Sequence, residues 1–147
     1  MQMRLVCNLL DGMVAVEAGA GVGKCGDIYN DLPDRVADVL IFLGAGLCAG
    51  GSEGPILGLL AAIGSVMTAY VRVLGKACGA GSYYIGPMAK QHRMATMTVG
   101  CLVGMVVVFF GRYLHAWMII PLSVVIVGCV ITCVRRLLRI AADLEAK

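Results

Sequence analysis

The fold of this chain is decided by residues 113–134, which read YLHAWMIIPLSVVIVGCVITCV and contain no Asp, Glu, Lys or Arg. A helix needs roughly 20 apolar residues to cross the hydrocarbon core of a bilayer. Three further stretches lack these charged residues, at 39–52, 54–71 and 94–111. We therefore expect an all-α, polytopic membrane helix bundle. Its four transmembrane helices would lie near residues 33–51, 54–75, 94–111 and 116–136.

The composition agrees with a membrane protein. Of the 147 residues, 60% are hydrophobic and 14% are charged, whereas about 25% are charged in a typical soluble domain. So few polar groups cannot cover the surface of a soluble domain. Disordered chains combine low hydrophobicity with high charge, and this composition has neither. The net charge is only +3 and forms no dense basic stripe, which disfavours a nucleic-acid partner. We expect residues 1–147 to form a single membrane domain in contact with lipid.

The basic residues predict the orientation, because Lys and Arg accumulate in short cytoplasmic loops. With four spans, eleven of the twelve Lys and Arg residues lie on one side, and only Arg112 lies on the other. This distribution predicts a multi-pass protein of the cell's inner membrane, with residues 1–32, the loop 76–93 and the tail 137–147 in the cytoplasm. The charges that would stop the last span at the membrane surface are Arg135, Arg136 and Arg139.

The acidic residues are concentrated near the first expected helix, and six of the nine lie between residues 11 and 38. A carboxylate at membrane depth costs roughly 2.5–3.5 kcal/mol, so these residues are functional candidates. Gly26, Asn30, Asp34 and Asp38 recur every four residues and would form one stripe along a helix. Oxygen ligands on one face suit a hard cation such as Mg²⁺. Pro33 interrupts this stripe and would either kink the helix or begin it.

Two segments near the start of the chain carry a family pattern. Residues 8–16 read NLLDGMVAV, and residues 26–34 read GDIYNDLPD. They resemble the CDP-alcohol phosphatidyltransferase family, whose pattern is D-x-x-D-G-x-x-A-R, then eight or so residues, then G-x-x-x-D-x-x-x-D. Asn8 and Asn30 stand where the family has aspartates, and Val16 replaces its arginine. The matching positions are Asp11, Gly12, Ala15, Gly26 and Asp34.

The resemblance implies an enzyme of phospholipid biosynthesis. A CDP-alcohol such as CDP-diacylglycerol would transfer its substituted phosphate to a small alcohol and release CMP. The cofactor would be Mg²⁺ or Mn²⁺, the active site would face the cytoplasm, and we expect a homodimer. The implied residues are Asn8, Asp11, Asn30 and Asp34 for the metal, Asp34 and Asp38 for catalysis, Gly12, Ala15 and Gly26 for close approach of the nucleotide, and Arg72, Lys90 and Arg93 for substrate phosphate.

The family fold is a six-helix bundle, so the resemblance also implies that the first helix and most of the second are missing here. Two other functions stay open. One is a catalytically inactive membrane protein that packs against a partner, and the other is a small transporter with an acidic cation site. The acid-rich segment also fits a solvated helix start without a ligand. Small residues four apart, which permit close helix packing, occur at Gly46/Gly50, Gly54/Gly58 and Gly100/Gly104.

Overall fold

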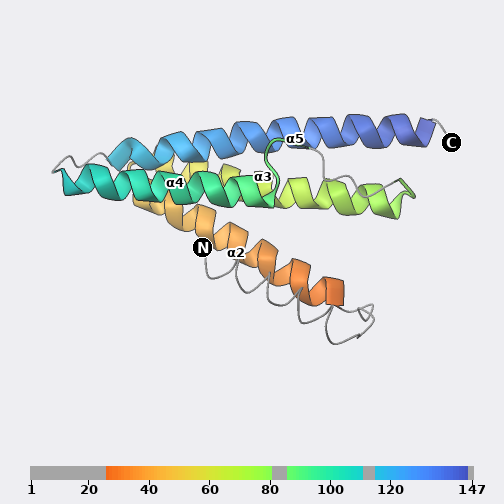
Figure 1. The fold of residues 1–147 in the computed structure, drawn as a ribbon, viewed down its shortest axis with the longest axis horizontal. Coiled ribbons are helices and arrows are strands. Elements are labelled where there is room, and N and C mark those ends of the chain that lie inside the picture. The colour runs from red at the N-terminus through yellow and green to blue at the C-terminus, as the bar shows by residue number, and fades with distance from the viewer. Residues whose placement is uncertain (1–25, 81–85, 111–114, 146–147) are drawn as a thin grey trace. The chain divides into compact units, whose positions relative to one another are not determined.

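The structure is a computed structural model that describes residues 26–80, 86–110 and 115–145. These residues form helices joined by short turns and contain no strand, which confirms the predicted all-α class. The chain divides into two compact units, residues 1–36 and 37–147. The elements are α2 (Gly26–Ala49), α3 (Glu53–Ala77), α4 (Lys90–Phe109), a short 3₁₀ helix η1 (His115–Met118) and α5 (Ile119–Glu145) (Figure 1).

Two helices are longer than their apolar stretches. α2 begins at Gly26, so Pro33 lies inside the helix and does not begin it. α5 continues through its three arginines to Glu145, since a charge can end the membrane-spanning part of a helix without ending the helix.

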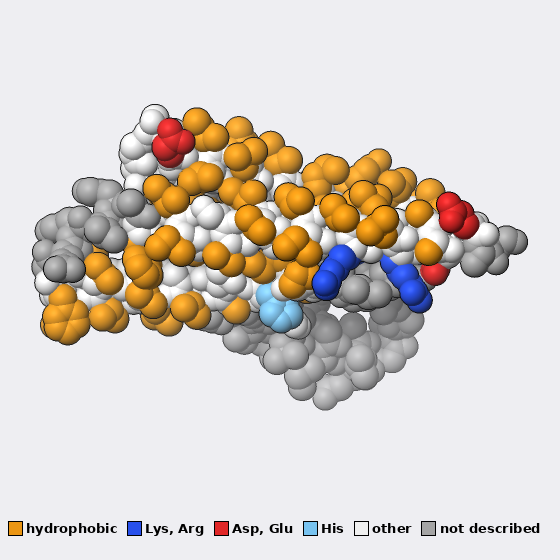
Figure 2. Space-filling view, turned by 90° about the horizontal axis from the view of Figure 1, so that it is seen from above, with side chains coloured by type: hydrophobic (Ala, Val, Ile, Leu, Met, Phe, Trp, Pro, Cys, Tyr) orange, Lys and Arg blue, Asp and Glu red, His pale blue; other side chains and the backbone are white. Residues whose placement is uncertain are grey.

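Three of the helices, α3, α4 and α5, are long and apolar enough to cross a membrane. Their outward side chains are also apolar, and Met105 and Phe109 are 70% and 86% exposed. Figure 2 shows hydrophobic side chains along most of one face, with the visible Lys and Arg toward one end. So much exposed apolar surface indicates a membrane-embedded protein. α2 is not among the three, and its role as a fourth span stays a prediction.

The core of the second unit lies between α3 and α5, which run side by side, and α4 packs against α5 and η1 (Figure 1). α3 contributes small residues, so the helices approach closely, and the larger side chains come from its neighbours. The core cluster consists of Phe42, Ala61, Ala62, Met88, Met94, Met97, Leu122, Val125 and Cys129. These contacts determine where along their lengths α3, α4 and α5 meet.

Glycines bring the second half of α2 against the start of α3. A Cβ atom on Gly58 would lie 2.7 Å from the Phe42 carbonyl oxygen and 2.9 Å from Gly46 Cα. The turn between the two helices uses Gly50 and Gly51, whose φ angles of 68° and 65° suit glycine. Because backbone meets backbone here, no side chain fits between α2 and α3.

The other small-residue pair is also used inside the chain. A Cβ atom on Gly100 would lie 2.8 Å from Pro121 Cγ, and one on Gly104 would lie 3.3 Å from Trp117 Cδ1. These glycines let α4 pack against η1 and the start of α5. The faces carrying Gly46, Gly54, Gly58, Gly100 and Gly104 therefore contact this chain's own helices.

Candidate functional site

The structure describes only part of the site that the sequence predicts. Asn8, Asp11, Gly12 and Ala15 lie outside the described residues. Gly26 and Asn30 belong to α2, and their side chains are likewise outside the description. Arg72 near the end of α3 and Lys90 at the start of α4 are both half-buried. The remaining predicted residues, Asp34, Asp38 and Arg93, are all buried.

The acidic stripe lies on a single helix, as its four-residue spacing requires. α2 is continuous over Gly26–Ala49, so Gly26, Asn30 and Asp34 lie one turn apart along it. Beside the stripe, the Arg35 guanidinium donates to the Asp31 carboxylate at 2.8 Å, one turn away on the same helix. Asp31 therefore already has a cationic partner within its own unit.

Asp38 is paired with Arg93, which is 55 residues away in sequence. Arg93 Nη2 donates to Asp38 Oδ2 at 3.3 Å, and the two side chains are only 3% and 0% exposed. A buried carboxylate needs such a partner, because an unpaired charge in the interior is strongly destabilising. The ion pair joins the second half of α2 to the first turn of α4.

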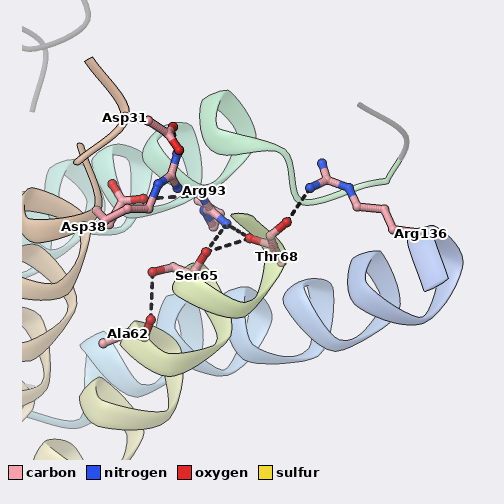
Figure 3. Close-up of polar contacts among 8 residues, drawn as sticks. Asp31, Asp38, Ala62, Ser65, Thr68, Arg93 and Arg136 are labelled. Carbon is pink, nitrogen blue, oxygen red and sulfur yellow. Dashed lines mark hydrogen bonds and ion pairs between the residues drawn. The ribbon is translucent and has the colours of Figure 1, made fainter. Parts of the chain in front are cut away.

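The same guanidinium also bonds to α3. Arg93 Nη1 donates to the Thr68 hydroxyl and, at 3.4 Å, to the Ser65 carbonyl oxygen. Thr68 Oγ1 in turn donates to that carbonyl at 2.7 Å, and Ser65 Oγ donates to the Ala62 carbonyl at 2.8 Å. Figure 3 shows the Arg93 side chain between Asp38 and these α3 residues. Arg93 therefore links α2, α3 and α4 at one level.

A second buried arginine reaches Thr68 from α5. Arg136 Nη1 donates to the Thr68 carbonyl oxygen at 2.6 Å, and the residue is 5% exposed. The role of Arg136 as a charge that stops the last span stays a prediction, but its side chain is buried, unlike those of the other two arginines. Its position explains the difference, because Arg136 lies on the side of α5 that packs against α3, whereas Arg135 and Arg139 are exposed. Thr68 thus accepts hydrogen bonds from two guanidinium groups (Figure 3).

This network differs from a metal site. Within residues 26–80, 86–110 and 115–145, no three His, Cys, Asp or Glu side chains gather closely enough to hold a metal ion. The predicted ligand set also includes residues 8 and 11, which lie outside these ranges. What the described residues do form is a charged contact among four helices, built from Asp38, Arg93, Thr68 and Arg136.

Sequence reasoning missed Ser65, Thr68 and Arg136 as members of the network. Ser65 and Thr68 are the small hydroxyl residues of α3, three residues apart and hence on one face. That spacing was a usable signal, since small hydroxyl residues in membrane helices bond across helix interfaces. Nothing in the local sequence of Arg136 separates it from its exposed neighbour Arg135.

No protein-family model, curated protein or solved structure matches the chain. The resemblance of residues 8–38 to CDP-alcohol phosphatidyltransferases therefore stays a prediction. It is carried by the sequence pattern and by the helical spacing of the acidic stripe.

Proposed function

We propose that this protein is a membrane transferase that moves a substituted phosphate from a CDP-alcohol, such as CDP-diacylglycerol, to a small alcohol and releases CMP. The observation that carries the proposal is the continuity of α2 through Pro33, which sets Gly26, Asn30 and Asp34 one turn apart on one helix. The family pattern requires this arrangement in its second half. An interrupted helix at Pro33 would have separated Asn30 from Asp34.

The donor set fits a hard divalent cation. Asp11 and Asp34 would supply carboxylate oxygens, and Asn8 and Asn30 would supply amide carbonyl oxygens. Mg²⁺ takes oxygen ligands of this kind, together with water and substrate phosphates. When bound, Mg²⁺ or Mn²⁺ would neutralise charge on the transferring phosphate and orient it. Gly12, Ala15 and Gly26 would leave room for the nucleotide because their side chains are small or absent.

This chain's own residues would complete the reaction. A carboxylate on the acidic stripe, Asp34 or Asp38, accepts the proton of the attacking alcohol. Arg72, Lys90 and Arg93 are the candidates for substrate phosphate, since guanidinium and ammonium groups bind phosphate oxygens. We propose that the chain works as a homodimer in which each copy holds its own stripe.

The basic residues favour an inner-membrane protein with several spans and a cytoplasm-facing site. Eleven of the twelve Lys and Arg residues fall on one side when four spans are counted. The acidic stripe precedes the charge-free part of the first span and so belongs to that same side. A CDP-alcohol and a soluble acceptor would both reach the site there, while the lipid chains stay in the bilayer.

The alternative of an inactive protein that packs against a partner has less support. Five of the six glycines on which it rests contact neighbouring helices of this chain, so their faces are already occupied. A transporter is also less well supported, because transporter acids lie near the membrane midplane. The acids here cluster at one end of the first helix.

CMP release from purified protein in mixed micelles tests the proposal. With CDP-diacylglycerol, Mg²⁺ and a mixture of small alcohols, CMP should appear, and EDTA should abolish its release. Asp34→Asn should lower the rate on the order of 10²-fold or more, as loss of a general base does. Asp143→Asn on α5, which removes a carboxylate that pairs with its helix neighbour Arg139, is the matched control. Equal activity in both variants would contradict the proposal.

A further inference from the structure

The last part of α5 carries three arginines whose surroundings differ. Arg136 is buried against α3, whereas Arg135 and Arg139 are exposed. The two exposed arginines are four residues apart, so they lie on the same flank of the helix with their Cβ atoms about 5–6 Å apart. The Arg139 side chain is 60% exposed although it pairs with Asp143. Two guanidinium groups therefore face the surroundings together, one turn apart.

The length of the preceding apolar stretch gives the depth of these arginines in a membrane. From His115 to Val134, η1 and α5 carry no Asp, Glu, Lys or Arg. At about 1.5 Å per residue, this stretch is about 30 Å long. The hydrocarbon core of a bilayer has about the same thickness. When α5 crosses the bilayer, Val134 therefore lies at one edge of the hydrocarbon core.

The headgroup layer is thick enough to hold both exposed arginines. A bilayer of about 40–45 Å with a core of about 30 Å has roughly 5–8 Å of headgroups on each side. Along the helix axis, Arg135 lies about 1.5 Å beyond Val134, and Arg139 lies about 7.5 Å beyond it. Asp143 lies about 13.5 Å beyond Val134 and is thus past the headgroups. Both positive charges are therefore at the depth of lipid phosphates.

Apolar side chains flank the two arginines. Val134 precedes Arg135, Leu137 and Leu138 lie between the two arginines in the sequence, and all three apolar side chains are exposed. They continue the exposed apolar surface of the membrane-spanning part of α5. A ligand at this place meets positive charge and apolar surface side by side. A phospholipid matches both, because it joins a phosphate to acyl chains, whereas a free phosphate matches only the charge.

We propose that Arg135 and Arg139 form a binding site for the headgroup of an anionic phospholipid. Their guanidinium groups donate hydrogen bonds to the phosphate oxygens, and Leu137 and Leu138 contact the beginning of the acyl chains. A headgroup with net negative charge is favoured over a zwitterionic one, because basic residues at the membrane surface attract anionic lipid. The occupant is a lipid of the bilayer, so this inference goes beyond the proposed function and does not depend on it.

Native mass spectrometry of the full chain in detergent tests the site. The probe is dioleoylphosphatidylglycerol, and the zwitterionic reference is dioleoylphosphatidylcholine. The wild type should bind the anionic lipid more tightly than the reference. Arg135→Gln and Arg139→Gln should each weaken binding of the anionic lipid about fivefold, and the double variant about 25-fold, because each basic residue at the surface contributes about that factor.

Arg136→Gln is the matched control, because it removes the same charge from the neighbouring buried position. It should leave the affinity for phosphatidylglycerol unchanged and lower the thermal unfolding midpoint, since the Thr68 carbonyl loses a hydrogen bond. A second control serves if Arg136→Gln does not fold. The double variant Arg135→Lys/Arg139→Lys keeps both charges and should retain the preference for phosphatidylglycerol.

Four outcomes would overturn the site. The wild type could bind both lipids equally well, or Arg135→Gln/Arg139→Gln could keep the wild-type preference. A folded Arg136→Gln could lose as much affinity as Arg135→Gln, which would make position on the helix irrelevant. Glycerol 1-phosphate, which has no acyl chains, could compete as well as the lipid and would indicate a site for soluble phosphate. The assay contains no CDP-alcohol and no acceptor, so its result is separate from the test of transferase activity.

Discussion

At the scale of single residues, Thr132 holds the segment that leads into α4. Its hydroxyl accepts a hydrogen bond from the Met88 amide at 3.1 Å and donates one to the Gly128 carbonyl at 2.7 Å. Gly86, with φ at 142°, packs its backbone directly against the Thr132 side chain. One buried hydroxyl on α5 therefore fixes the chain two residues before α4 begins.

Thr132→Val should destabilise the protein by about 1–3 kcal/mol, because the buried Met88 amide loses its acceptor. The unfolding midpoint in detergent measures this loss. Thr96→Val is the matched control, since the hydroxyl of half-buried Thr96 bonds to the His92 carbonyl of its own helix. Its effect should stay within about 0.5 kcal/mol. Equal losses in the two variants would contradict the role given to Thr132.

At the scale of helices, two glycines of α2 differ in their surroundings although they are only two residues apart. Gly46 contacts the backbone of Gly58, whereas a Cβ atom on Gly44 would have nothing within 4 Å. The close contact between α2 and α3 is therefore local to one face. The spacing of small residues in the sequence does not by itself show which of them contact another helix.

Gly58→Ala and Gly44→Ala should consequently change stability in opposite directions. The new methyl group at residue 58 would meet backbone atoms of Phe42 and Gly46, and overpacking costs about 1–3 kcal/mol. At residue 44 the space is open, and alanine gains up to about 1 kcal/mol of helix propensity over glycine. Chemical or thermal unfolding of both variants in the same detergent measures the difference. A loss at residue 44 as large as that at residue 58 would refute the contact.

At the scale of the whole molecule, the apolar exterior means that the cost of an added charge for membrane insertion should depend on where along a helix the charge lies. Val127, near the middle of the charge-free stretch in α5, is 58% exposed. Val127→Arg should weaken membrane insertion by about 2.5–3.5 kcal/mol, the cost of arginine at a span centre. Leu144→Arg near the end of α5 should insert like the wild type. The inserted fraction in a microsome assay measures both, and equal insertion of the two variants would count against α5 as a span.

Much of the fold can be predicted from the charge-free stretches, because the length of an apolar stretch is read directly from the sequence and can be compared with the thickness of the bilayer. They predict α3 to within two residues at each end. They miss the start of α2 and the end of α5, since helical hydrogen bonding continues into charged segments at the edge of an apolar stretch. The sequence around Pro33 also does not decide whether a helix begins there or continues through it, and α2 continues through it.

The pairing within the candidate site could not be predicted in the same way. The sequence predicts oxygen ligands for a cation along the acidic stripe and a catalytic role for Asp38. The observed partner, Arg93, comes from a different helix, α4, and is 55 residues away in sequence. Sequence position assigns charged residues to loops and membrane edges. It therefore does not predict an ion pair between helices that are far apart in the sequence.

Trp117 gives the molecule an intrinsic optical reporter. It is the only tryptophan in the chain, and its indole Nε1 donates to the Gly100 carbonyl of α4 at 3.1 Å. Indole emission shifts to longer wavelength when the ring gains contact with water, so fluorescence should follow the separation of η1 from α4 without any attached dye. The folding of one helix–helix contact can thus be timed in lipid vesicles as well as in detergent.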